Sequence, residues 1–183
     1  MHNYLFQSER LGFRLWAMED FPVLSAINAD PEVMHFFPNV KKESETRAFI
    51  EKSQKRYKEF GYYFFAVDRL DLDRCIGFIG LNHVNSQANF TPSVEIGWRL
   101  AKVDQGNGFA TEGAKACLKF GFEQLKLDAI YSICPCINVP SENVMKKIGM
   151  KKQGVFNHPM LKDYPRIENC FIYKINKKEG QTN

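Results

Sequence analysis

The order of apolar and polar residues along the chain predicts both strands and helices. Alternation with a period of two predicts strands over residues 11–18, 62–68, 74–84, 93–100, 129–136, 150–156 and 166–175. Apolar positions three and four residues apart predict helices over residues 20–28, 30–37, 44–60, 109–125 and 140–148. Asp20 is expected to cap the first of these helices, and Gly61 and Gly149 are expected to end two others.

This order of elements indicates a mixed α+β domain built around one sheet. Helices come first, a hairpin follows, and strands and helices then alternate to the end of the chain. Residues 62–68 and 74–84 are the two strands of the hairpin. Gly77 and Gly80 in its second strand predict a bulge or a close approach of a neighbouring backbone.

Length and composition narrow the class of protein. With 183 residues there is room for one domain, which we expect over residues 1–176, followed by a polar tail over residues 177–183. Apolar residues make up 44% and charged residues 25%, which is typical of a globular chain rather than a disordered one. A net charge of +4 argues against a nucleic-acid partner. We also expect no membrane partner, because no apolar run is long enough to span a bilayer and the first residues do not resemble a signal peptide.

Cysteines and aromatic residues add two expectations. The five cysteines, at positions 75, 117, 134, 136 and 170, fit neither a zinc-site spacing nor a disulfide framework. They predict reduced thiols in a cytoplasmic protein without a metal site. Aromatic residues reach 14% of the chain, with 16 Phe, which indicates either an aromatic core or an aromatic-lined pocket.

The segment from Gln105 to Thr111 carries the clearest chemical signal. It lies between a predicted strand and a predicted helix, and its two glycines allow backbone N–H groups to converge. Together with the partial positive charge of a helix N-terminus, these groups favour a phosphate or pyrophosphate. A P-loop lysine is absent, and Thr111 stands where a dinucleotide fingerprint needs its third glycine. The spacing alone leaves both an anion cradle and a plain tight turn open.

The residues Gln105 to Ala110 resemble the Gln/Arg-x-x-Gly-x-Gly/Ala signature of the GNAT N-acetyltransferase superfamily. Residues 94–100 resemble the strand before this loop, and residues 138–150 resemble the Asn-x-x-Ser segment that follows the next strand. Residues 8–15 resemble the start of the ribosomal-protein N-terminal acetyltransferase (Rim-type) branch. The resemblance implies a mostly antiparallel sheet whose two central parallel strands, 94–100 and 129–136, splay apart in a V.

The resemblance also implies acetyl-CoA as the acetyl donor, with no metal. The residues that it assigns to donor binding are Leu100, Val103, Gln105, Gly106, Asn107, Gly108, Phe109, Ala110, Thr111, Asn138, Ser141 and Asn143. Asn138 has a second interpretation, because it also fits an Asx turn before Pro140.

Two side chains are expected to move protons. Glu95, on the strand before the loop, is the expected general base, with His83 as its rival and an ion pair with Arg99 as the non-catalytic alternative. Many members of the superfamily use a Tyr as the acid, but Met145 stands at that position. Ser141 matches a serine that approaches the CoA sulfur in the Rim-type branch and is the expected acid. It also fits the N-cap of the helix over residues 141–148.

The function that the resemblance implies is acetyl transfer from acetyl-CoA to a primary amine, by direct attack in a ternary complex. The amine is a protein N-terminus or a small molecule, and a homodimer is left open. The alternative is a non-catalytic acyl-CoA-binding or regulatory module, which the missing Tyr favours. Aromatic residues expected at the acceptor are Phe36, Phe37, Tyr62, Tyr63, Phe90 and Tyr164.

Overall fold

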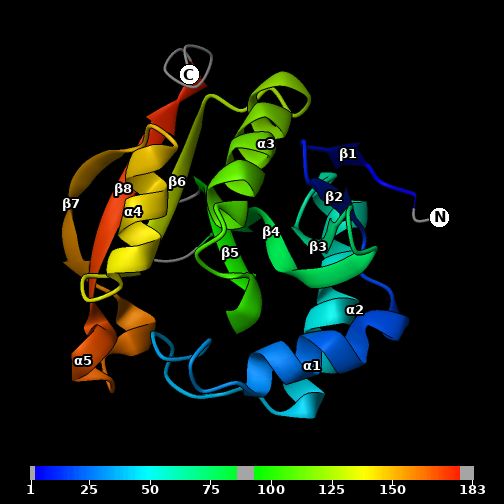
Figure 1. The fold of residues 1–183 in the computed structure, drawn as a ribbon. Coiled ribbons are helices and arrows are strands. Elements are labelled where there is room, and N and C mark those ends of the chain that lie inside the picture. The colour runs from blue at the N-terminus through cyan, green and yellow to red at the C-terminus, as the bar shows by residue number, and fades with distance from the viewer. Residues whose placement is uncertain (1–2, 86–92, 178–183) are drawn as a thin grey trace.

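The computed structural model describes residues 3–85 and 93–177 (Figure 1). In this part of the chain, eight strands form one sheet in the order β1-β2-β3-β4-β5-β6-β8-β7. The strands are β1 (Phe6–Gln7), β2 (Leu11–Arg14), β3 (Phe64–Arg69), β4 (Arg74–Val84), β5 (Ser93–Leu100), β6 (Ala129–Pro135), β7 (Lys151–Asn157) and β8 (Asn169–Asn176). Only β5 and β6 pair in parallel among them, and every other neighbouring pair is antiparallel.

Helices cover both faces of this sheet. They are α1 (Phe21–Ala29), α2 (Glu43–Phe60), α3 (Phe109–Glu123), α4 (Val139–Lys147) and α5 (Pro165–Glu168), with short 3-10 turns at η1 (Met18–Asp20), η2 (Lys102–Asp104) and η3 (Pro159–Leu161). Figure 1 shows α3 and α4 side by side in front of the sheet, with α1 and α2 below. The side chains of β3 alternate accordingly: Phe65 and Val67 pack in the core that includes α3, whereas Ala66 packs with Leu24 of α1 and Ile50 of α2.

The predicted fold class is confirmed, with corrections at element boundaries. The strand predicted over residues 11–18 ends at Arg14, and β1 has no counterpart in the prediction. The strand predicted over residues 166–175 begins only at Asn169, after the short helix α5. Gly61 and Gly149 follow α2 and α4 in the left-handed conformation, at φ 76° and 84°, as predicted.

The helix predicted from Asp30 toward Phe37 is wrong. Residues 31–36 form turns, in which the Asp30 carboxylate accepts a hydrogen bond from the backbone N–H of Glu32 (2.8 Å). An aspartate that bonds the backbone two residues ahead stabilises a turn in competition with a helix. The aromatic side chains of Phe36 and Phe37 therefore come from a loop rather than from a helix face.

Glycines in β4 allow the backbones of the central strands to come close, as predicted. A Cβ atom at Gly80 would lie 2.3 Å from the carbonyl oxygen of Tyr63, and one at Gly77 would lie 2.1 Å from that of Arg99. Gly77 also has φ 135°, and the β3–β4 register shifts beside it, between Val67 and Asp68.

The parallel strands β5 and β6 diverge as the resemblance implied. Their register has one residue pair, Glu95 with Tyr131. The Ser132 hydroxyl donates to the carbonyl oxygen of Ile96 (3.0 Å), and beyond this bond the two strands separate. The V-shaped splay is thus present, and its vertex lies at Glu95.

Candidate functional site

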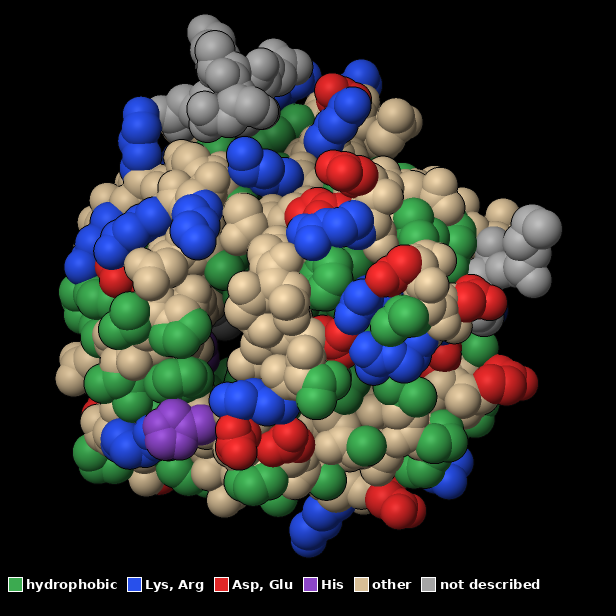
Figure 2. All heavy atoms as spheres, viewed as in Figure 1, with side chains coloured by type: hydrophobic (Ala, Val, Ile, Leu, Met, Phe, Trp, Pro, Cys, Tyr) green, Lys and Arg blue, Asp and Glu red, His purple; other side chains and the backbone are tan. Residues whose placement is uncertain are grey.

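A cavity of about 930 Å³ lies at the splay between β5 and β6. Its lining includes the start of α3, the start of α4, the gap between the strands, and side chains from α2 and the loop after α1. In the space-filling view, a hollow opens between α4 and the N-terminal end of α3 (Figure 2). The cavity therefore connects the face of the sheet that carries α3 and α4 with the face that carries α1 and α2.

The glycine-rich loop forms the N-terminal end of α3. Gly106 and Gly108 have left-handed φ values of 78° and 82°, and Gly108 is the N-cap of the helix. No heavy atom lies within 4 Å of a Cβ position built at Gly106, so a ligand can approach this backbone closely. The first N–H groups of α3 point out of the helix end and favour an anion.

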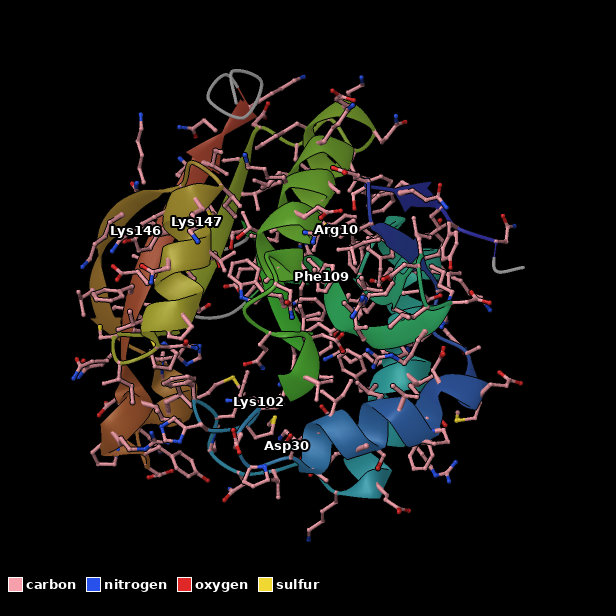
Figure 3. All side chains as sticks on the ribbon, viewed as in Figure 1. Arg10, Asp30, Lys102, Phe109, Lys146 and Lys147 are labelled. Atoms are coloured by element: carbon pink, nitrogen blue, oxygen red, sulfur yellow. The ribbon has the colours of Figure 1, made fainter. Side chains whose placement is uncertain are left out.

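Two side chains near the N-terminus, Ser8 and Arg10, anchor this loop. The sequence did not predict these contacts. Arg10 donates from Nε to Glu112 Oε2 (2.7 Å) and from Nη1 to the carbonyl oxygen of Asn107 (3.2 Å). Ser8 also donates to Glu112 (2.7 Å). The Arg10 guanidinium lies 4.5 Å from the Phe109 ring centroid, and Figure 3 shows the two side chains together at the start of α3. The Phe109 side chain is therefore packed away, which leaves its backbone N–H for a ligand.

Most of the predicted donor-binding residues line the cavity. They are Leu100, Gln105, Gly106, Gly108, Phe109, Ala110, Thr111, Asn138, Ser141 and Asn143. Val103 and Asn107 are not among the lining residues. The Val103 side chain is 77% exposed, and the Asn107 amide donates to the carbonyl oxygen of Gln105 (3.1 Å). Gln105 itself donates to the carbonyl oxygen of Leu100 (3.0 Å), so it closes the loop onto β5.

The start of α4 corrects one of the alternatives for Ser141. The N-cap is Asn138, whose Oδ1 accepts the backbone N–H of Ser141 (3.1 Å). Ser141 is thus the third residue of the helix, and the Cys134 thiol on β6 donates to the carbonyl oxygen of Asn138 beside it (4.0 Å). Burial raises the pKa of Cys134 to about 12, so this thiol is neutral near pH 7. The Met145 side chain is fully buried in the core and does not line the cavity.

Glu95 lies in the cavity with an unusual proton affinity. Burial raises the pKa of its carboxyl group to about 7. No hydrogen bond or ion pair reaches this carboxyl group from residues 3–85 or 93–177. The alternative ion pair with Arg99 is wrong, because Arg99 donates to Asn28 Oδ1 (2.6 Å) instead.

His83 does not share the site. Its ring stacks on Phe60 with the centroids 4.9 Å apart, and it is not among the residues that line the cavity. Its neighbour in register on β5 is Val94, one residue before Glu95. Near the vertex of the splay, the cavity therefore contains Glu95 and not its predicted rival.

Aromatic side chains form the wall on the α1–α2 side. Of the predicted residues, Phe36, Phe37 and Tyr63 line the cavity; Tyr62 packs on Phe60 and Tyr164 accepts a hydrogen bond from Asn39 (3.3 Å), both away from it. Phe90 lies outside the described residues. Phe49, Phe64 and Phe78 complete the wall and were not predicted. The pairing of β3 with β4 beneath α2 brings them together, which no local pattern could reveal.

Residues 3–85 and 93–177 contain no cluster of three or more His, Cys, Asp or Glu side chains that could hold a metal ion. None of their helices combines the length and the hydropathy that crossing a bilayer requires.

Comparisons with known proteins assign the fold to a family. Residues 10–151 match the acetyltransferase (GNAT) domain family. An uncharacterised N-acetyltransferase of Bacillus subtilis, YnaD, is 33% identical over 150 residues, which cover 81% of this chain and 84% of that protein. A crystal structure of a GNAT-family acetyltransferase from Bacillus anthracis superposes with a TM-score of 0.80 at 29% identity, covering 94% of this chain and 98% of that one. The ribosomal-protein acetyltransferase RimL, solved with coenzyme A, shares the fold at 15% identity, with a TM-score of 0.77 over 95% of this chain and 98% of its own. The chain therefore belongs to the GNAT acetyltransferase family, and it is an acyltransferase.

Proposed function

We propose that this protein transfers the acetyl group of acetyl-CoA to a primary amine by direct attack within a ternary complex. One observation carries the proposal: a single cavity joins the glycine-rich start of α3, the gap between β5 and β6, and the Glu95 carboxyl group. The donor and the acceptor then enter from opposite faces of the sheet and meet at the splay. The name of YnaD as an N-acetyltransferase and the coenzyme A bound to RimL support the two halves of this assignment.

The donor half offers backbone groups to acetyl-CoA. The N–H groups of the loop and of the first turn of α3 suit its pyrophosphate. Ala101 N–H bonds the Ile76 carbonyl oxygen of β4 (2.8 Å), so the N–H of Leu100 and both backbone groups of Trp98 point the other way, into the gap, while the Leu100 carbonyl oxygen accepts the Gln105 amide. An extended pantetheine arm can add to this edge as a partial strand.

Transfer requires three events for which the cavity supplies groups. The ammonium form of the acceptor loses a proton to the Glu95 carboxylate, directly or through a water. The amine nitrogen then attacks the thioester carbon, and a β5 backbone N–H facing the gap stabilises the oxyanion. The nitrogen of this tetrahedral intermediate carries one proton more than the amide product, and that proton passes to the leaving sulfur through the Ser141 hydroxyl or a water, so the products are the amide and the CoA thiol. As the C–S bond breaks, the Ser141 hydroxyl donates a hydrogen bond to the departing thiolate.

The free state of all five cysteines supports the expected cytoplasmic location.

Release of CoA in the presence of acetyl-CoA and an amine panel tests the proposal. The panel should contain short peptides with free N-termini, single amino acids and polyamines. We expect amine-dependent CoA release together with an acetylated product of the matching mass. Binding of acetyl-CoA without turnover on any of these amines would instead favour the non-catalytic acyl-CoA-binding module.

Replacing Gly108 by valine is expected to raise the Kd for acetyl-CoA by about tenfold or more, since each hydrogen bond to a charged phosphate contributes roughly 1.5–3 kcal/mol. Gly108 has φ 82°, and a branched side chain there displaces the backbone N–H groups that face the ligand. Titration calorimetry measures the effect. Gly61→Val is the matched control, because Gly61 has a similar φ of 76° at the end of α2 and does not line the cavity. Equal affinities in the two variants would remove the cradle assignment.

Replacing Ser141 by alanine is expected to lower kcat by about tenfold while the KM for acetyl-CoA stays near that of the wild type, since a neutral hydrogen bond to a developing charge contributes roughly 1.5–3 kcal/mol. The backbone N–H of Ser141 still bonds Asn138 in this variant, so α4 keeps its cap. Steady-state kinetics separate the two parameters. An unchanged kcat would mean that the thiolate takes its proton from water.

A further inference from the structure

Arg99 is a cation in the acceptor half of the cavity with most of its hydrogen-bonding capacity unused. Glu95, Gly97 and Arg99 share one face of β5, toward α1 and α2, and both charged side chains line the cavity. A guanidinium has five N–H donors. Among the described residues, Asn28 accepts one of them (2.6 Å), and Arg99 Nε is buried without any partner.

The surroundings hold this guanidinium in place without neutralising it. Asn28 is oriented by its own amide, which donates to Thr46 Oγ1 on α2 (3.0 Å). The guanidinium carbon lies 4.3 Å from the Phe37 ring centroid and 5.2 Å from that of Phe78. Burial among these groups lowers the pKa of Arg99 to about 10, which still leaves it charged at neutral pH.

The other acidic side chains of the cavity are already paired. Glu32 accepts an ion pair from Lys102 (2.8 Å) and Glu45 one from Lys41 (2.9 Å). Asp104, beside the glycine-rich loop, is bound by Arg69 and Arg74. This pairing leaves Arg99 as a partly buried positive charge, with a buried and unpaired Nε, facing an aromatic-walled space.

We propose that Arg99 selects an acceptor amine that also carries a carboxylate, which the guanidinium binds while the amine lies at Glu95. The inference rests on the proposed acetyl transfer and specifies its substrate class. A partly buried cation without a counter-charge favours an anionic group from the ligand, and the planar fork of a guanidinium matches a carboxylate. The same charge disfavours a polyamine.

The spacing along β5 indicates how far apart the two groups of the acceptor are. Glu95 and Arg99 are four residues apart, which is about 13 Å along a strand. Both side chains line the cavity, and the amine and the carboxylate of one amino acid are too close together to bridge such a separation. A peptide N-terminus with an acidic residue at its second position provides the longer separation.

The test compares two peptides that differ in one group, Ala-Glu-amide and Ala-Gln-amide. The wild-type protein is expected to acetylate the Glu peptide with a kcat/KM at least about tenfold higher, the effect of a charge-assisted hydrogen bond. In Arg99→Gln this preference is expected to fall to within about twofold, as kcat/KM falls for the Glu peptide alone. Lys52→Gln, which removes another cation of the cavity lining, is the matched control and should keep the preference.

Each outcome of this test shows whether Arg99 selects the acceptor or only stabilises the structure. The proposal is overturned if the wild-type protein shows no preference for the Glu peptide, or if Arg99→Gln lowers kcat/KM equally for both peptides. Arg99 would then have only the structural role of linking β5 to α1 through Asn28. If Arg99→Gln does not fold, Arg99→Lys keeps the charge without the fork, and its preference should be reduced but still favour the Glu peptide. If no amine is turned over, calorimetric binding of the two peptides in the presence of CoA tests Arg99 independently of the proposed acetyl transfer.

Discussion

Replacing Glu95 by glutamine is expected to lower kcat by about a hundredfold or more, because proton transfer to a positioned side chain contributes roughly 10²–10⁴-fold. The pKa of this carboxyl group, raised by burial to about 7, is the reason. An ordinary carboxylate is too weak a base to deprotonate an ammonium group near neutral pH, whereas a buried one is suited to it. Glutamine keeps the size and polarity of the side chain and removes the basic oxygen. Steady-state kinetics with acetyl-CoA and an accepted amine measure the loss.

The pH dependence of the rate is a second signature of the same group. Only the ionised form of Glu95 accepts a proton, so the wild-type kcat/KM is expected to rise with pH through about 7. The glutamine variant should lack this step. If the variant retained wild-type kinetics or the same step, another group would be the base. His83, whose ring stacks on Phe60, would then be the next candidate, and His83→Ala the next variant to measure.

Stability distinguishes lost chemistry from lost folding. The pKa of Glu95 is raised in the folded state, so folding favours its protonated form. The stability that comes from this preference for the protonated form is fully present at pH values below the pKa of Glu95 in the unfolded chain. It is lost as pH rises through the folded-state pKa of about 7. Glu95→Gln avoids this loss, so above pH 7 it is expected to be at least as stable as the wild type. Chemical denaturation at pH 6 and pH 8 measures the difference.

Glu45→Gln is a matched control for this change. Glu45 lines the same cavity from α2, but it is exposed and pairs with Lys41. Because exposed ion pairs contribute about 0–1 kcal/mol, both its activity and its stability are expected to stay close to those of the wild type. A comparable loss of kcat in Glu45→Gln would show that the cavity responds to any lost carboxylate rather than to a specific base.

The parts of the site that sequence predicts are those formed by short segments. The glycine pattern at 106 and 108 permits a tight left-handed turn without steric cost, and the structure has φ 78° and 82° there. The alternation along residues 93–100 assigns Glu95 and Arg99 to one face regardless of the strand's neighbours. The apolar stripe of α3 likewise predicts its helix and its buried face.

The parts that sequence does not predict depend on residues far apart in the chain. Arg10 and Glu112, which fix the start of α3, are separated by 102 positions, and Arg99 and Asn28 by 71. Alternation at residues 11–18 extended the first strand too far, because the chain leaves the sheet after Arg14 to enter η1 and α1. Arg14, the last residue of β2, is a charged side chain that is only 7% exposed.

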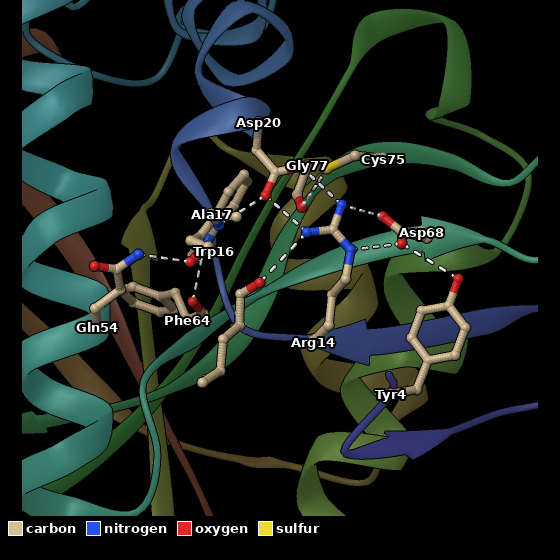
Figure 4. Close-up of polar contacts among 11 residues, drawn as sticks. Tyr4, Arg14, Trp16, Ala17, Asp20, Gln54, Phe64, Asp68, Cys75 and Gly77 are labelled. Carbon is tan, nitrogen blue, oxygen red and sulfur yellow. Dashed lines mark hydrogen bonds and ion pairs between the residues drawn. The ribbon is translucent and has the colours of Figure 1, made fainter. Parts of the chain in front are cut away.

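Replacing Arg14 by glutamine is expected to reduce the free energy of unfolding by about 3–5 kcal/mol, because it leaves two buried carboxylates without their counter-charge. All five N–H groups of this guanidinium are used: Asp68 and Asp20 accept two each, at 2.7–2.9 Å, and the Leu15 carbonyl oxygen accepts the fifth (Figure 4). Asp68 is fully buried, and Asp20 also accepts the backbone N–H of Ala17. The network thereby joins β2, β3 and the entry into α1.

Two further variants make this expectation specific. Arg14→Lys keeps the charge but not the fork, so its loss should lie between those of the wild type and the glutamine variant. Arg56→Gln removes the partly exposed partner of Glu59 (3.6 Å) and should cost less than about 1 kcal/mol. Urea denaturation of the three variants gives the comparison, and equal losses of unfolding free energy in Arg14→Gln and Arg56→Gln would contradict a structural role for the network.

Because Arg14 does not line the cavity, the kcat of its variants should stay near the wild-type value at urea concentrations well below their unfolding midpoints. Loss of activity without loss of stability would instead indicate that the network positions α1 and the acceptor wall beside it.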